Sequence, residues 1–313
     1  MVKSFFKYIL PNFIINLILK FYIKLIRIKS FETSESFWNE NTVSSPKDGF
    51  ASISESLNHL KWRNNQYINS YENMNFKNTH KKIVLDYGCG PGNGIINITN
   101  STKPKKIHAV DVSKKSIFLA KKRAALHKLK VDFHHIHENQ IMHDIKTNSI
   151  DIIKCDGVLH HIKDMAFVFK EFKRVLKKNG VINLMIYNKD SLWFHLHVNY
   201  ELMIKRKIFS NLTAEEVFRI STDGFQCPVS NCFSPNEFIK ICKRNKFKSK
   251  LSNVSVSLFE LSKIKLIKEA IESKKLKKEN KRFLRKVNFK EGKIPYVGEN
   301  VAGINAYYEL RNL

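Results

Sequence analysis

Residues 82–92 read Lys-Ile-Val-Leu-Asp-Tyr-Gly-Cys-Gly-Pro-Gly. The apolar run that ends at Asp86 is typical of a short β-strand, and residues 93–100 after the glycines can form a helix. Because glycine has no side chain, a glycine-rich turn between a strand and a helix lets the backbone approach a ligand closely. The segment therefore predicts a nucleotide-type binding site at the end of a strand.

The chain continues to alternate between strand and helix patterns as far as residue 187. We expect strands at residues 107–111, 131–136, 150–154 and 181–187, and helices at residues 114–129 and 165–177. This alternation predicts a parallel, doubly wound α/β sheet with helices on both faces, whose sites lie at the carboxyl ends of the strands. Beyond it the pattern predicts a helix at 234–245, a strand at 248–258, helical structure at 261–290 and a final strand at 303–310.

Three features separate this glycine-rich turn from one that binds a dinucleotide. An acidic residue, Asp86, ends the first strand and begins the pattern D-x-G-x-G-x-G. The second strand ends at Asp111, where a carboxylate can accept both hydroxyl groups of a ribose. The fourth strand leads into residues 156–162, Asp-Gly-Val-Leu-His-His-Ile. Together these features indicate a site for S-adenosylmethionine (SAM).

Four segments in this order resemble the class I SAM-dependent methyltransferases, in the branch often called type 11. They are VLDYGCGPGNG (84–94), AVDVS (109–113), SIDIIKCDGVLHHIKD (149–164) and FKRVLKKNGVINLMIYN (172–188). A looser resemblance, to uncharacterised bacterial members, extends from about residue 37 to residue 310. It implies a Rossmann-like fold with a seven-stranded, mostly parallel sheet, N-terminal helices and a cap inserted after the fifth strand.

The resemblance also implies which residues bind SAM. The turn from Gly88 to Gly90 is expected beside the methionine part, and Asp86 either anchors the loop or meets the amino group through water. Asp111 is expected to hold the ribose. Glu138 is the candidate for the adenine amino group, although the family's acidic residue would align with His137. The full expected set is Asp86, Gly88, Cys89, Gly90, Asp111, Val112, Glu138, Asp156 and Gly157, the last two at the methyl-transfer end.

Methyl transfer from a sulfonium releases a neutral thioether, so positioning and exclusion of water can supply most of the catalysis without a metal. An acceptor that carries a proton also needs a base. His160 and His161 are the candidates, with His195 and His197 next, and a structural role is the alternative for each. Three cysteines with no CxxC pair, Cys227, Cys232 and Cys242, are a poor match to zinc-ligand spacing, so we expect no metal.

Residues for the methyl acceptor are less clearly marked. Tyr187 and Asn188 end the fifth strand and are expected to face the pocket. Trp193 and Asp223 lie in the expected cap. Arg63 could reach a carboxylate of SAM or of the acceptor. Packing or loop hydrogen bonding explains each of these residues equally well.

The first thirty residues are apolar and basic. At about 100° per residue, the polar residues between 12 and 28 fall on one narrow stripe of a helix. A wide apolar face with a basic stripe is typical of a helix that lies on an anionic membrane surface, and the alternative is that it covers the protein's own core. We therefore divide the chain into this helix (1–30), an N-terminal helical cap (31–80), the SAM-binding core (81–190) and a substrate cap that completes the sheet (191–313).

The composition narrows the function without naming the acceptor. The formal net charge is +27, from 55 Lys and Arg against 28 Asp and Glu, and the lysines are scattered along the chain. Five cysteines without regular spacing favour a reduced, cytoplasmic protein, peripheral at the inner face of the membrane if the first helix binds lipid. We expect methylation of an oxygen, nitrogen or carbon of a small-molecule or lipid-linked acceptor. One alternative is nucleic-acid methylation, although the sequence lacks the D/N-P-P-Y/F and Pro-Cys motifs of DNA methyltransferases. The other is a non-catalytic SAM-binding module.

Overall fold

The computed structural model describes residues 31–313 apart from residues 32, 44, 210, 291 and 293. The helix expected at residues 1–30 lies outside the described residues, and its proposed membrane surface with it. Among the described residues, no helix has the length and apolarity needed to cross a bilayer.

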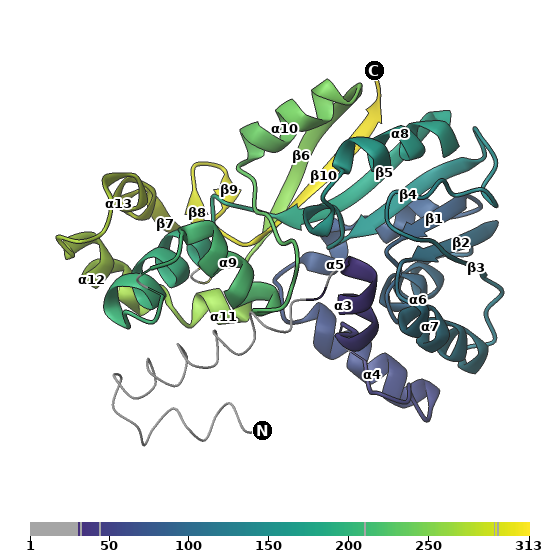
Figure 1. The fold of residues 1–313 in the computed structure, drawn as a ribbon, viewed down its shortest axis with the longest axis horizontal. Coiled ribbons are helices and arrows are strands. Elements are labelled where there is room, and N and C mark those ends of the chain that lie inside the picture. Colours follow the sequence, from purple (N-terminus) through teal and green to yellow (C-terminus); the bar gives the residue numbers. More distant parts are fainter. Residues whose placement is uncertain (1–30, 32, 44, 210, 291, 293) are drawn as a thin grey trace.

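A seven-stranded sheet in the order β3-β2-β1-β4-β5-β10-β6 forms the centre of the molecule (Figure 1). All neighbouring strands pair in parallel except β10, which is antiparallel to both β5 and β6. The predicted mostly parallel seven-stranded sheet is therefore confirmed. Its strands are β1 (Ile83–Tyr87), β2 (Lys106–Asp111), β3 (Asp132–His135), β4 (Ile150–Asp156), β5 (Leu176–Tyr187), β6 (Phe247–Ser255) and β10 (Asn305–Asn312).

Helices cover both faces of this sheet because alternate residues of the buried strands are apolar on each side. On one face, Leu85 and Ile153 belong to a buried cluster with Phe172 of α8 (Met165–Val175) and Phe238 of α10 (Pro235–Arg244). On the other face, β1 and β2 pack against α6 (Asn93–Ser101), α7 (Lys114–Leu126) and the short η1 (Phe76–Thr79).

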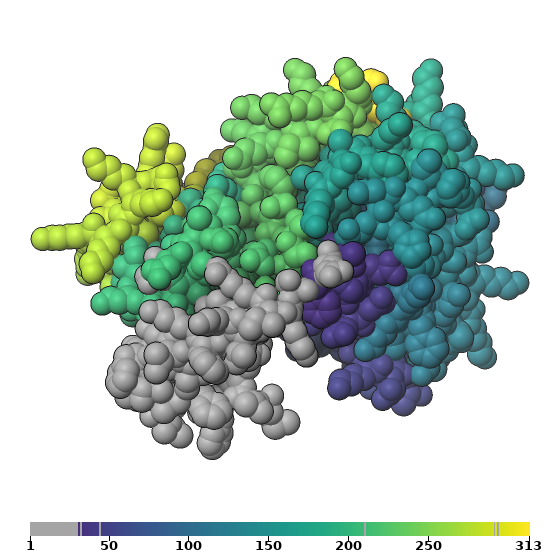
Figure 2. All heavy atoms as spheres, viewed as in Figure 1, coloured from purple at the N-terminus to yellow at the C-terminus, as the bar shows by residue number. Residues whose placement is uncertain are grey.

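Two groups of additional elements lie at the carboxyl ends of the strands. The N-terminal group is α3 (Ser34–Glu40), α4 (Ile53–Asn64) and α5 (Ser70–Asn73), in keeping with the helical segment expected there. The second group follows β5 and contains the π-helix η3 (Trp193–Lys205) and α9 (Ala214–Asp223). In the space-filling view, α3 in dark purple lies against the teal-blue core (Figure 2).

The segment between β6 and β10 corrects two expectations. The strand expected to reach residue 258 ends at Ser255, because the Ser257 side chain and Glu260 form a capping box that starts α11 (Leu258–Leu261). The helical stretch expected at 261–290 is divided into η4 (Ile264–Leu266), α12 (Ile267–Glu272) and α13 (Lys278–Arg285). It ends in a small antiparallel sheet made of β7 (Val287–Lys290), β8 (Ile294–Val297) and β9 (Asn300–Val301).

Candidate SAM and acceptor site

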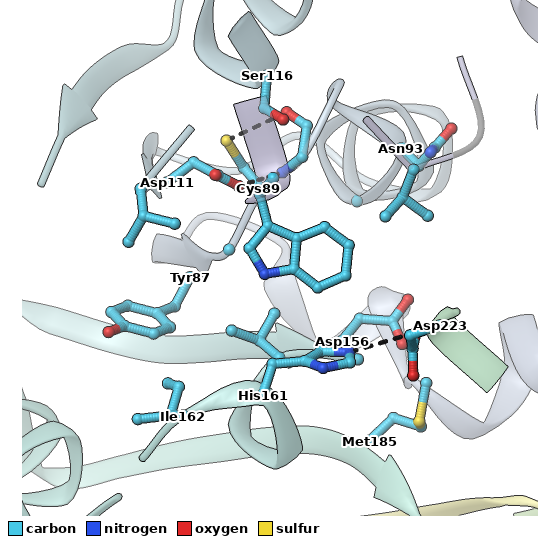
Figure 3. A pocket seen from close by; sticks show the side chains of 18 of the residues that line it. Tyr87, Cys89, Asn93, Asp111, Ser116, Asp156, His161, Ile162, Met185 and Asp223 are labelled. Atoms are coloured by element: carbon cyan, nitrogen blue, oxygen red, sulfur yellow. Dashed lines mark hydrogen bonds and ion pairs between the residues drawn. The ribbon is translucent and has the colours of Figure 1, made fainter. Parts of the chain in front are cut away.

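A cavity of about 560 Å³ opens at the carboxyl ends of β1, β2, β4 and β5. Side chains from α3, α4 and α11 contribute to its wall from the other side. Figure 3 shows the labelled side chains converging on this space from several strand ends. The cavity therefore lies where a doubly wound sheet is expected to bind a ligand.

The glycine-rich turn forms one end of the cavity. Gly88, Gly90 and Gly92 have φ angles of +73°, +50° and +86°. Residues that have a Cβ atom rarely adopt such positive φ angles, whereas glycine does so readily. The N–H groups of Gly88 and Cys89 donate to the carbonyl of Val110 at 2.8 and 3.0 Å, so the turn is fixed to β2. A Cβ on Gly88 would lie 2.3 Å from the side chain of Val158, whereas a Cβ on Gly90 would meet no atom within 4 Å. Gly90 thus leaves open space in which a ligand can approach the backbone.

Asp111 connects this turn to the start of α7. Its Oδ2 accepts a 2.8 Å hydrogen bond from the Gly90 N–H, and its Oδ1 accepts one of the same length from Ser113. Burial raises the pKa of the Asp111 carboxyl, and the two backbone donors act against that rise. Each carboxylate oxygen has two lone pairs, so Asp111, which lines the cavity beside Val112, keeps acceptor capacity for hydroxyl groups.

Asp86 is a buried carboxylate with an unused acceptor. Its Oδ2 has no hydrogen-bond partner among the described residues, although the side chain lines the cavity. Burial, together with the nearby negative charges of Asp156 and Asp111, raises the pKa of Asp86 from 3.8 to about 7. Such an oxygen fits the ammonium group of a SAM methionine moiety, which would supply both the missing donor and a compensating charge.

Arg63 reaches from α4 across the cavity to Asp156, at the end of β4. Its Nη2 lies 3.5 Å from Asp156 Oδ2, and both side chains are partly exposed to the cavity. Gly157, next to Asp156, has a φ of +76° and also lines the cavity. The structure thus brings the predicted Arg63, Asp156 and Gly157 together with the glycine turn.

Glu138 and His137 lie at the far edge of the same cavity, near α3. Glu138 Oε1 accepts a 3.0 Å hydrogen bond from the backbone N–H of Ser34, at the first turn of α3. His137 Nδ1 lies 2.7 Å from Glu35 Oε2. Glu138 therefore holds α3 in place while lining the cavity, in addition to any contact with the ligand.

His161 lines the cavity on the side formed by Tyr187 and Asp223. Its Nδ1 lies 2.8 Å from the carbonyl oxygen of Val229, which can only accept, so Nδ1 carries the proton. In the neutral ring Nε2 is then unprotonated, and it lies 3.8 Å from Asp223 Oδ1. The hydroxyl of Tyr187 donates to Asp223 Oδ1 at 3.2 Å and that of Ser230 to Oδ2 at 2.6 Å. Nε2 of His161 thus stands beside a carboxylate that two hydroxyl groups hold in place (Figure 3).

The structure corrects the expectation that His160 and Asn188 face the cavity. His160 is fully buried behind the wall, where its ring stacks on Tyr187 at 3.8 Å and its Nδ1 accepts from the Tyr187 N–H. Burial holds the pKa of His160 well below its usual value. Asn188 donates through Nδ2 to the carbonyls of Asp190 and Gly303, so it fixes the backbone between β5 and the start of β10. Neither side chain lines the cavity.

The other two candidate histidines also lie away from it. His195 stacks on Phe283 of α13, and its Nδ1 lies 2.7 Å from the amide oxygen of Asn280. His197 Nδ1 lies 2.7 Å from the buried carboxylate of Glu201. Both therefore stabilise the cap. Trp193, from the same helix, does line the cavity, together with Tyr187 and Asp223.

Several cavity residues were not among the site residues predicted from the sequence, although Trp38, Trp62 and Tyr67 fall within the looser family resemblance. Trp38 of α3 packs edge-on against His161 with ring centroids 4.9 Å apart. Phe259 of α11 packs against Trp193 at 4.8 Å. Trp62, Tyr67, Met185, Ser257 and Asn305 complete this part of the wall. Apart from Met185, which lies in the quoted segment 172–188, each comes from a segment whose position depends on long-range packing.

Comparisons with known proteins agree with this geometry. Residues 78–206 match the family model described as a methyltransferase domain. The chain is 25% identical to a ubiquinone biosynthesis O-methyltransferase of Pelagibacter ubique, over 75% of this chain and 88% of the relative. It is 30% identical to an uncharacterised protein of Methanocaldococcus jannaschii, over 52% of this chain and 64% of that protein.

A solved structure supports the fold. The YcgJ protein of Bacillus subtilis superimposes with a TM-score of 0.50 at 15% identity, covering 78% of this chain and 99% of that one. Taken with the glycine turn and the strand-end carboxylates, the matched methyltransferase domain supports a class I SAM-dependent methyltransferase.

Proposed function

We propose that the protein transfers the methyl group of SAM to a hydroxyl oxygen of an apolar, small-molecule or lipid-linked acceptor, with His161 as the general base. The observation that carries this proposal is the position of His161: it lines the cavity with Nε2 3.8 Å from Asp223 Oδ1, while its Nδ1 faces the carbonyl of Val229. The choice of oxygen is supported by the relative named as a ubiquinone biosynthesis O-methyltransferase.

In this proposal, one end of the cavity binds SAM and the other end binds the methyl acceptor. Asp86, Asp111 and the turn at Gly90 would hold SAM, and Arg63 would meet a carboxylate. When bound, SAM supplies an electrophilic methyl group on a sulfonium that leaves as a neutral thioether. At the acceptor end, His161 Nε2 would take the hydroxyl proton as the oxygen attacks the methyl carbon. The resulting imidazolium would face the Asp223 carboxylate, which stabilises positive charge there.

The class of acceptor is inferred from the wall of the cavity. Tyr67, Tyr187 and Trp193 present aromatic surface at this end. Val43, Trp62 and Phe259 line the cavity and are also 48%, 56% and 40% exposed, so they lie where it opens to solvent. An apolar rim around an opening is typical of a site for an apolar ligand.

Membrane attachment through residues 12–28 stays a prediction. The full-length protein is expected to float with vesicles that contain anionic lipid. A version beginning at Phe31 is expected to stay folded and to bind SAM but not to float. Aggregation of the shorter version, with no flotation of the full-length protein, would assign these residues to the protein's own core.

The proposed reaction is tested by following S-adenosylhomocysteine formation with hydroxylated aromatic and lipid-extracted acceptors. With an accepted substrate, His161→Gln should lower kcat by about 10²- to 10⁴-fold, the range for a general base, with SAM affinity little changed. His160→Gln is the matched control, because that ring lies outside the cavity. Methyl transfer to nitrogen alone, or an unaffected kcat in His161→Gln, would refute the proposal.

A further inference from the structure

Three side chains of types that commonly bind metal ions come together beside the proposed acceptor end of the cavity. They are His161, in the turn after β4, Asp223, at the end of α9, and Cys227, four residues further along. One ligand atom from each lies within 4.8 Å of the other two. His161 and Cys227 are buried, and Asp223 exposes 12% of its side chain. His161 Nε2 lies 3.8 Å from Asp223 Oδ1, and Cys227 Sγ lies 3.9 Å from the other ring nitrogen, Nδ1. In a tetrahedral zinc site the ligand atoms lie roughly 3.3–3.8 Å apart, so a small rotation of the Cys227 side chain toward Nε2 would complete the set.

The surroundings hold these ligand atoms in place. The carbonyl of Val229 accepts from both His161 Nδ1, at 2.8 Å, and the Cys227 thiol, at 3.2 Å. Donation from Nδ1 leaves Nε2 as the nitrogen with a free lone pair. The hydroxyls of Tyr187 and Ser230 fix Asp223. Hydrogen bonds of this kind, which orient ligands from outside the coordination sphere, are characteristic of metal sites in proteins.

We infer that His161, Asp223 and Cys227 form a site for a zinc-type divalent cation that inhibits the methyltransferase. A set of one nitrogen, one oxygen and one sulfur suits borderline-soft ions such as Zn²⁺ or Co²⁺ and disfavours Mg²⁺ and Ca²⁺, which take oxygen ligands. On binding, the Cys227 thiol loses its proton to solvent and the thiolate bonds to the metal. His161 and Asp223 line the cavity, which provides the path of entry for the ion.

The inhibitory effect rests on the proposed function, because it requires His161 Nε2 to be the base. An ion on Nε2 removes the lone pair that would take the acceptor proton, and it occupies the acceptor end of the cavity. Zinc should therefore compete with the acceptor. Zinc should leave SAM binding unchanged, because Asp86 and Asp111, the carboxylates proposed to bind SAM, are not among the proposed metal ligands.

A second cluster could also take up a divalent ion and must be distinguished. Glu35, His135 and His137 bring ligand atoms within 4.8 Å of one another near α3. In that cluster His135 Nε2 already lies 3.0 Å from the carbonyl of Val112 and so carries a proton toward it. The cluster of Glu35, His135 and His137 contains no sulfur. A metal–thiolate absorption band can therefore arise only from the cluster that contains Cys227.

Cobalt binding tests the site without any need for catalysis. Chelator-treated full-length protein is titrated with Co²⁺, and we expect near-ultraviolet thiolate charge transfer with intense visible bands of tetrahedral cobalt. Cys227→Ser should remove the charge-transfer band and lower the affinity by at least about 10-fold, because a bonding ligand is lost. Cys232→Ser is the matched control and should behave like the unchanged protein. Cys227→Ala with a measured Tm replaces the serine variant if that variant fails to fold.

Kinetics then test inhibition. With an accepted substrate, Zn²⁺ should raise the apparent KM for the acceptor in the unchanged protein and in Cys232→Ser. In Cys227→Ser, basal activity should persist and a higher Zn²⁺ concentration should be needed. An absent cobalt–thiolate band, or a band that survives Cys227→Ser, overturns the metal site whatever the acceptor proves to be. A normal band without inhibition overturns the link to His161 as base.

Discussion

The backbone N–H of Gly90 donates a 2.8 Å hydrogen bond to Asp111 Oδ2, so the glycine turn after β1 and the carboxylate at the end of β2 form one unit. The other oxygen of Asp111 accepts from Ser113 at the start of α7. A shift of the glycine turn would therefore also move the Asp111 carboxylate and any ligand bound to it. Changes at either residue should affect SAM binding.

Replacing Asp111 with Ala should weaken SAM binding by about 1.5–3 kcal/mol, the range for loss of charged hydrogen bonds. Calorimetry on the folded variant measures this. Asp111→Asn is the companion variant, because it keeps one oxygen acceptor but removes the charge, and it should lose less. Unchanged affinity in Asp111→Ala would show that another residue holds the ribose.

Side chains added at the two glycines of the turn should have different effects. Gly90→Val should abolish SAM binding while leaving the fold largely intact, because a Cβ there would enter open cavity space. Gly88→Ala should lower the Tm, because its Cβ would lie 2.3 Å from Val158. Both positions have positive φ, so thermal unfolding should accompany each binding measurement. A folded Gly90→Val that binds SAM normally would contradict the placement of the ligand.

Asp86 should make stability and SAM affinity depend on pH in opposite directions. Its pKa is raised from 3.8 to about 7, so the native state holds a proton that the unfolded state has lost between these values. The contribution of Asp86 to the free energy of unfolding of the ligand-free protein is thus fully present below about pH 4 and is lost as pH rises through about 7. The loss is at most roughly 4 kcal/mol, at about 1.4 kcal/mol per pKa unit. An ammonium ligand needs the ionised form, so SAM affinity should rise over the same upper range.

The neutral variant Asp86→Asn separates these effects. Above pH 7 its Tm should exceed that of the unchanged protein when no ligand is present, while its SAM affinity should be lower and less dependent on pH. Differential scanning calorimetry and binding titrations at several pH values measure both quantities. A pH dependence of SAM affinity that persists in Asp86→Asn would assign it to another group.

Glu138 should act through α3 as well as through the ligand. Glu138→Ala removes the acceptor for the Ser34 N–H, so amide exchange in Ser34–Glu40 should speed up and SAM affinity should fall. Glu138→Gln keeps an oxygen acceptor and should protect α3 almost as well. If both variants lose the same SAM affinity while α3 exchange stays slow, contact with the ligand is the main role of Glu138.

The sequence by itself determined the parts of the protein that depend on local patterns. Alternating strand and helix signals predicted the doubly wound sheet, because burial on both faces requires continuous apolar strands. The D-x-G-x-G-x-G turn and Asp111 predicted the SAM end of the cavity. These features could be predicted because they depend only on residues close together in the sequence. Glycine allows the positive φ angles at Gly88 and Gly90, and Asp111 directly follows the apolar residues of its strand.

Tertiary structure decided everything that depends on segments far apart in the chain. His160 and His161 are adjacent in sequence, yet one packs beneath Tyr187 and the other faces the cavity beside Asp223. Cys227 had no zinc-ligand spacing, but the cap places it with His161, 66 residues earlier. Side-chain direction and long-range proximity follow from how the cap packs on the sheet, and that packing is set by the whole buried core rather than by any local motif.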